Sequence, residues 1–158
     1  NHEDRFNRWA NKNPRQASAI DLDGFLGFRQ YWDSIHPFKE YVTIDGISYT
    51  HVPHTTMGKP IGGVNKCRRV YLETSHPTIF GHGHDLQVAT SGTLQGGAAT
   101  RFALSAPAFM EDGNVEAYAK GNQTGWSYGV LKVFPQGPDR VPSYQYVSMR
   151  DLQEQYGN

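Results

Sequence analysis

Two histidines follow a short apolar run near the middle of the chain, and their types and spacing can bind a metal ion. The run is Thr78–Phe80, and the histidines are His82 and His84, each preceded by a glycine. Side chains at i and i+2 of an extended segment share a face, and glycine lets the backbone turn tightly past a strand end. Neutral imidazole is a common ligand of borderline divalent metals. The segment therefore predicts a metal-binding loop, with a solvated polar loop as the alternative.

Residues of matching chemistry stand at two other places. Asn1 and His2 open the chain and are followed by the carboxylates Glu3 and Asp4. His51 ends a β-favouring run, where side chains from a sheet edge often converge on a site. Two divalent ions held by histidines, an asparagine oxygen and carboxylates can clamp a phosphate and activate a hydroxide for in-line attack. Such a site also needs a proton donor for the leaving oxygen, which a histidine that binds no metal can provide.

Hydrophobic periodicity predicts the elements that must position these residues. An Asp-Gly pair between Tyr41–Ile44 and Ile47–His51 is a strong hairpin signal, which places His51 at the end of the second strand. Val52–Pro53 stops that strand, so His54 falls in the loop and is the rival candidate to His51.

Helical spacing and strict alternation predict the remaining elements. The predicted helices are His2–Lys12, Asp21–Ile35, Asn65–Glu73 and Met149–Tyr156, with a loop over Asn13–Gln16. The predicted strands beyond the hairpin are Thr78–Phe80, Leu86–Thr90, Asn114–Lys120, Trp126–Phe134 and Tyr144–Met149. The glycine-rich segment Ser91–Thr100 fits a tight crossing or a loop that faces substrate.

Composition limits the classes of function. The 158 residues suit one domain with a sizeable core, so we expect a single domain over 1–158. The formal net charge is +0, so the chain has no overall basic field to recruit nucleic acid. We find no apolar run of membrane-spanning length and no signal-peptide pattern, and we expect no membrane association.

The single cysteine, Cys67, excludes an internal disulfide and favours a reducing cytoplasm. It lies among the cations Lys66, Arg68 and Arg69, which can lower the pKa of its thiol. An incidental helix cysteine is the favoured interpretation. The same three cations are weak candidates for contacts with nucleic acid, because cations on one helix usually form a solvated face.

These segments, in their order, resemble motifs of the calcineurin-like metallophosphoesterases. Asn1–Glu3 is similar to the tail of the family's Gly-Asn-His-Glu/Asp motif, and Gly81–His84 is similar to its closing Gly-His-X-His motif. His51, at a predicted strand end, fits the single histidine between them. The later part of the chain, through the last predicted helix, resembles the C-terminal portion of small phage or bacterial members.

The resemblance implies an α/β fold, a β-sandwich flanked by helices with a metal cleft at the strand ends. It implies two divalent metal ions, and nitrogen and oxygen ligands suit Mn, Fe, Zn and Ni alike. Asn1, His51 and His82 would bind one ion, and His84 would bind the other. His2 would be the histidine that binds no metal and stabilises or protonates the leaving group.

The resemblance also implies missing parts. The family's opening Asp-X-His motif and its Gly-Asp motif, whose aspartate bridges the metals, do not occur in the sequence. We therefore expect the fold to lack its N-terminal strands, with an exposed sheet edge, and an upstream segment to carry both motifs. We expect little or no hydrolysis by this chain alone. Glu3 or Asp4 would orient His2 by hydrogen bonding behind it.

The implied activity is hydrolysis of a phosphoester in a nucleotide, a nucleic acid or a phosphoprotein. A non-catalytic binding or assembly domain that keeps the fold without the site is the first alternative. A single-metal β-barrel of cupin type is the second, and it is disfavoured because cupins need a glutamate and another histidine on nearby strands.

Overall fold

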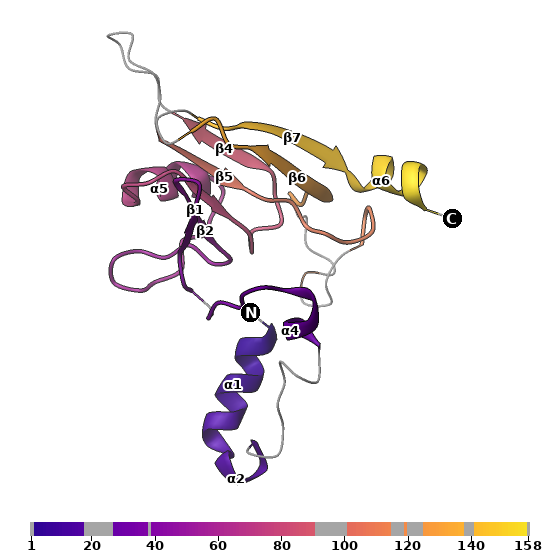
Figure 1. Ribbon diagram of the computed structural model, residues 1–158. Helices are drawn as coiled ribbons and strands as arrows, with labels where there is room; N and C mark the ends of the chain where they lie inside the picture. The colour runs from indigo at the N-terminus through magenta and orange to yellow at the C-terminus, as the bar shows by residue number, and fades with distance from the viewer. Residues whose placement is uncertain are drawn as a thin grey trace. The chain divides into compact units, whose positions relative to one another are not determined.

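The computed structural model describes residues 2–17, 27–37, 39–90, 101–114, 119, 125–137 and 141–157. The chain divides into two compact units, Asn1–Glu40 and Tyr41–Asn158 (Figure 1). In the described parts of both units, no helix is apolar over a length that would cross a membrane.

The first unit begins with α1, His2–Lys12, as the sequence predicts. The predicted loop after it is wrong, because Pro14–Ala17 forms the short helix α2. The backbone N–H groups of Gln16 and Ala17 both donate to the Asn13 carbonyl oxygen, at 3.1 and 3.0 Å. Proline suits the first position of such a turn, because its fixed φ is already helical and its missing N–H has no intrahelical acceptor there.

The second predicted helix, Asp21–Ile35, is wrong in its extent. Residues 21–26 lie outside the described part of the chain. The described part contains α4, Phe28–Tyr31, and residues 32–37 are not helical. Gly27 has a φ of 68°, which is left-handed, so a right-handed helix cannot run through it.

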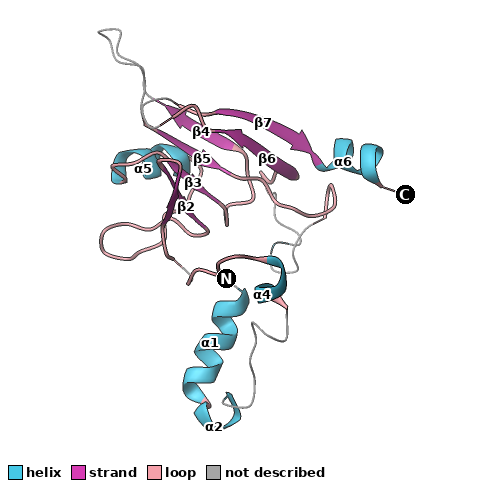
Figure 2. Cartoon of the chain, in the orientation of Figure 1, coloured by secondary structure: helices cyan, strands magenta, loops and turns pink. Residues whose placement is uncertain are grey.

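The second unit is built on a five-stranded mixed sheet, whose strands lie in the order β1-β2-β3-β5-β4 (Figure 2). The strands are β1 Val42–Ile44, β2 Ile47–Thr50, β3 Thr78–Phe80, β4 Gln87–Thr90 and β5 Phe102–Ser105. The neighbours β2, β3 and β5 are parallel, and β1 and β4 flank them in antiparallel pairing.

The predicted hairpin is confirmed as β1 and β2. Asp45 and Gly46 connect the strands with φ values of 51° and 77°. Positive φ at both central residues is the geometry of the tight turns that match the twist of a hairpin, and Asp-Gly is among the pairs that adopt it most readily. The turn fixes the register Ile44↔Ile47 and so determines where β2 begins.

The strand β5, which lies between β3 and β4, was not predicted from the sequence. All four of its residues are buried, and Leu104 has no exposed surface. A strand covered on both faces shows no alternation of polar and apolar residues, and a run of four residues is too short for its period to be recognised. The glycine-rich segment before it also gave no sign that a strand follows.

Two apolar layers cover the two faces of the sheet. Helix α5, Lys66–Glu73, packs through Cys67 and Val70 on one face. The antiparallel pair β6, Gly129–Phe134, and β7, Ser143–Ser148, covers the other face through Leu131 and Val133 (Figure 1). The second unit is therefore a mixed α/β structure with a five-stranded and a two-stranded sheet.

The predicted helix Met149–Tyr156 is confirmed as α6. Ser148 caps it, because its side-chain oxygen accepts a hydrogen bond from the Asp151 backbone N–H at 3.1 Å. The predicted strand Asn114–Lys120 lies mostly outside the described residues, and Asn114 itself is in no strand.

The burial of β5 leads to a stability prediction. We expect Leu104→Ala to lower the free energy of unfolding by about 2–5 kcal/mol, because it leaves a cavity in a fully buried core. Leu104 lies on the face that β6 and β7 cover, so the cavity lies between the two sheets. Leu72→Ala on α5 is the control, since Leu72 is 64% exposed. Urea unfolding followed by circular dichroism measures both variants. Equal losses in the two variants would contradict the placement of β5 in the core.

Candidate metal-binding site

The carboxyl ends of the parallel strands bring the predicted histidines of two segments together. His51 directly follows β2, and His82 comes two residues after β3. Thr50 pairs with Phe80 in the parallel register, so both strands end at the same level of the sheet. The imidazole centroids of His51 and His82 are 5.4 Å apart, with the rings edge to face at 70°.

The backbone of the histidine loop differs from the expectation that its glycines make the turn. His82 and His84 themselves have left-handed φ values of 65° and 58°. Each such residue costs about 1 kcal/mol or more, because Cβ crowds the backbone there. The glycines instead provide space. A Cβ on Gly81 would lie 3.2 Å from the His51 Nδ1 atom, and one on Gly83 would overlap the Lys66 side chain.

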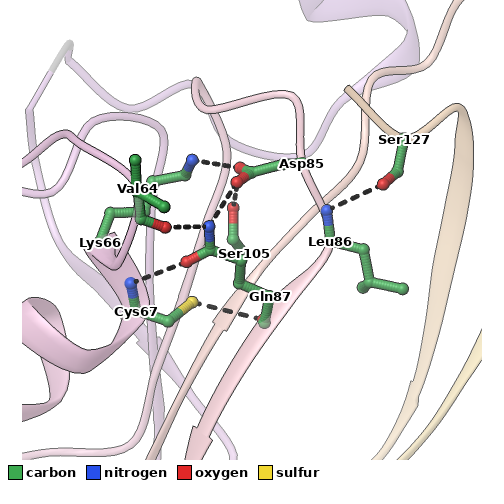
Figure 3. A network of polar contacts seen from close by, with 8 residues as sticks. All are labelled: Val64, Lys66, Cys67, Asp85, Leu86, Gln87, Ser105 and Ser127. Atoms are coloured by element: carbon green, nitrogen blue, oxygen red, sulfur yellow. Dashed lines mark hydrogen bonds and ion pairs between the residues drawn. The ribbon is translucent and has the colours of Figure 1, made fainter. Parts of the chain in front are cut away.

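A network of polar contacts around Asp85 anchors the histidine loop (Figure 3). The Lys66 ammonium forms an ion pair with Asp85 Oδ1, and both side chains are largely buried. Gln87 Nε2 donates to Asp85 Oδ2 at 2.5 Å and to the Val64 carbonyl at 2.6 Å. The Ser105 hydroxyl donates to Asp85 Oδ1 at 3.4 Å. Asp85 thus has a structural role, since three side chains contact its carboxylate. Lys66 is not part of a solvated basic face.

His84 faces an aromatic ring that the sequence analysis did not single out. Its imidazole stacks on Trp126 with centroids 4.5 Å apart and planes at 23°. The Ser127 N–H donates to the His84 carbonyl at 2.8 Å, and the Leu86 N–H donates to Ser127 Oγ at 3.2 Å. The segment before β6 therefore fixes both the ring and the backbone of His84. Nothing in the sequence indicates this contact, since the two segments are far apart along the chain.

Burial lowers the pKa of His82, and the neighbouring His84 and Lys66 lower it further. All of these effects disfavour the protonated ring. The neutral imidazole is the form that carries a free lone pair for a metal.

The rival candidate His54 has a different environment. Its ring lies 5.0 Å from the Tyr41 ring, and its Nδ1 is 3.4 Å from the Val52 carbonyl oxygen. Its backbone N–H donates to the Tyr41 hydroxyl. These contacts tie His54 to the chain before β1, whereas His51 meets His82.

The remaining predicted site residues belong to the first unit. Asn1 lies outside the described residues, as do the side chains of His2, Glu3 and Asp4, whose backbone forms the start of α1. Their approach to the histidine pair stays a prediction. Among the side chains that the structure describes, no three of the His, Cys, Asp and Glu type are close enough together to hold an ion.

Comparisons with known proteins found no matching family model, no matching curated protein and no matching solved structure.

The suggestion that Cys67 is activated by its cationic neighbours is wrong. Cys67 is 2% exposed, and burial raises the pKa of its thiol to about 12. The thiol donates to the Gln87 carbonyl at 3.3 Å, and the Cys67 backbone N–H donates to Gln87 Oε1 at 3.3 Å. The favoured interpretation as a structural helix cysteine agrees with this environment.

The raised pKa predicts that Cys67 resists alkylation. Near pH 8 the folded thiol stays protonated, whereas an unperturbed cysteine is partly thiolate, which is the reactive form. Iodoacetamide should modify the folded chain at least about tenfold more slowly than the urea-unfolded chain, as followed by mass spectrometry. Equal rates would show that the thiol is accessible and ionised in the fold.

The crowding at Gly83 predicts the effect of a single methyl group. Gly83→Ala should push the Lys66 side chain away from Asp85 and lower the free energy of unfolding by about 1–3 kcal/mol. Gly62→Ala is the matched control, because Gly62 has no atom within 4 Å of an added Cβ and its φ is not left-handed. Thermal unfolding compares the two, and a Gly83→Ala variant as stable as the control would contradict the role of this network.

Proposed function

We propose that this chain carries part of the site of a dinuclear metal-dependent phosphoester hydrolase of the metallophosphoesterase type. The observation that supports the proposal most is the pairing of His51 and His82 at the ends of adjacent parallel strands. Two separated segments with the predicted spacing thereby present imidazoles to one place. The mixed α/β fold is compatible with such a site.

In this proposal, His51 and His82 bind one divalent ion together with the Asn1 side-chain oxygen, and His84 binds the other. The ions, Mn, Fe, Zn or Ni, supply positive charge that binds a phosphate and lowers the pKa of water. His2 donates a proton to the leaving oxygen, and Glu3 or Asp4 orients its ring.

The stack on Trp126 is compatible with a ligand role for His84. A metal binds the lone pair of a ring nitrogen, which lies in the plane of the imidazole, whereas Trp126 contacts the face of that ring. Stacking thus restrains the tilt of His84 without covering its coordinating edge. A restrained ligand loses less freedom when it binds, which favours affinity.

The proposal requires a bridging carboxylate that the histidine loop does not provide. Asp85 is the carboxylate of that loop, and it is held by Lys66, Gln87 and Ser105. An upstream segment with Asp-X-His and Gly-Asp motifs is the proposed source. Substrates would be phosphoesters of a nucleotide, a nucleic acid or a phosphoprotein, and this chain alone should hydrolyse them poorly.

Asp85 forms an ion pair with Lys66, and this structural role also favours the alternative of a non-catalytic binding or assembly domain. In that alternative the histidine pair is a remnant, and upstream motifs would be absent or altered. A cupin-type barrel is less compatible with the fold, because cupins are antiparallel double sheets and the present sheet has a parallel centre.

Metal binding separates these hypotheses. We expect His51→Ala and His82→Ala each to weaken Zn²⁺ or Mn²⁺ binding by at least about tenfold, because each removes one direct ligand. His76→Ala is the control, since His76 is an exposed histidine in a turn before Pro77. Isothermal titration calorimetry measures the affinities. Equal affinity in all three variants would place the metal elsewhere.

Hydrolysis of bis(p-nitrophenyl) phosphate with added Mn²⁺ gives the second measurement. The chain alone should show little turnover, and addition of the upstream segment should increase it. An upstream reading frame without the Asp-X-His and Gly-Asp motifs would favour the binding-domain alternative.

A further inference from the structure

A hollow of about 580 Å³ lies between helix α5 and strand β4. It is lined by two short segments, 64–68 at the start of α5 and 87–90 along β4, through Val64, Asn65, Cys67, Arg68, Gln87, Val88, Ala89 and Thr90. None of the proposed metal ligands lines it. The hollow is therefore a separate feature of the second unit.

The strand that forms one wall is an edge of the five-stranded sheet, since β4 pairs with β5 alone among the described strands. In an antiparallel pair, every second residue directs both backbone groups away from its neighbour. The Ala106 N–H donates to the Phe80 carbonyl, so every second residue of β5 counted back from Ala106 directs its backbone groups to β3. Ala103 and Ser105 therefore face β4, where they pair with Ala89 and Gln87. Val88 and Thr90 are then the outward-facing positions of β4. β4 also lacks the charges and prolines that usually protect a sheet edge.

The chemistry around the hollow is cationic. Arg68 is the charged residue of the lining, and no carboxylate lines the hollow. The Tyr71 ring restrains Arg68, whose guanidinium carbon lies 5.4 Å from the ring centroid. Arg101 lies over the same ring at 4.7 Å and donates to the Tyr71 carbonyl. Arg68 is thus held beside an open strand edge, where it can pair with an anion.

We propose that the groove between β4 and α5 binds an extended acidic peptide. The peptide adds a strand to β4 through the outward backbone groups at Val88 and Thr90, and one of its carboxylates pairs with Arg68. Its alternate side chains would lie on the α5 face, in the hollow, and the intervening ones would lie on the same face as the side chain of Val88, which is 50% exposed.

Two other occupants fit the groove less well. Single-stranded nucleic acid needs a basic track and open aromatic faces, whereas the lining has Arg68 as its cation and both arginines already lie over Tyr71. A second copy of the chain, paired through β4, would bring Arg68 of both copies to the same seam. Like charges there oppose such a dimer.

The test uses a fluorescein-labelled hexapeptide of alternating Glu and Val as the probe, with fluorescence anisotropy as the readout. Matched probes replace each Glu by Lys, or a central Val by Pro. A fluorescein-labelled oligothymidylate tests for nucleic acid. We expect saturable binding of the Glu-Val peptide alone, since the Lys peptide repels Arg68 and the proline removes a strand hydrogen bond.

Variants of the chain locate the binding surface. Arg68→Glu should weaken the Glu-Val peptide by at least about fivefold and favour the Lys peptide, and Arg69→Glu is the control because Arg69 is exposed next to the lining. Val88→Pro should also weaken binding, because it removes an outward donor while leaving the β5 hydrogen bonds. Circular dichroism checks that each variant folds.

Loss of binding in Arg68→Glu, with affinity retained in Arg69→Glu, would support the proposal even if Val88→Pro fails to fold. No saturable binding of the Glu-Val peptide at millimolar concentration would overturn it. Tighter binding of the oligothymidylate, or a concentration-dependent dimer that the peptide cannot dissociate, would also overturn it.

Discussion

The ion pair between Lys66 and Asp85 joins helix α5 to the loop that carries His82 and His84. A largely buried ammonium and carboxylate are costly to separate, so the helix and the loop must keep one relative position. Gln87 and Ser105 bond to the same carboxylate, which brings β4 and β5 under the same constraint. The edge of the sheet where the histidines meet is therefore defined by a polar contact made between the helix and the strand ends.

The same contacts explain how the strained backbone next to Asp85 is maintained. His82 and His84 hold left-handed conformations that a free loop of these residues would leave. Asp85 anchors the chain directly after them, and Trp126 and Ser127 hold His84 from another segment. The surrounding contacts compensate for the strain, and strain that is maintained in this way often marks a place where side-chain direction matters more than stability. The direction that results turns His82 toward His51.

The sequence predicted those parts of the fold whose signals are local. The Asp45-Gly46 turn predicted the hairpin, Val52–Pro53 predicted the end of β2, and the apolar run before Gly81 predicted β3. The contact between His51 and His82 followed from where these two strands end. Strand β5 was not predicted, because burial on both faces removes the alternation of polar and apolar residues. The ion pair of Lys66 was not predicted, because its partner Asp85 is far along the chain. A cation in a basic run cannot be distinguished from a solvated one until its partner is known. The stack of His84 on Trp126 was not predicted either, because the two residues are far apart along the chain.

The parallel centre of the sheet has a consequence for how this protein folds. Strands β2, β3 and β5 pair only after long intervening segments have closed, and β5 must settle between β3 and its own antiparallel neighbour β4. Loop closure of this kind costs chain entropy before any contact compensates for it, so such topologies fold slowly compared with local hairpins. The β1–β2 turn can form early and alone, whereas the strand ends that carry His51 and His82 meet only when the chain has nearly completed its sheet. A ligand that needs both histidines would then recognise the finished fold and would slow its unfolding.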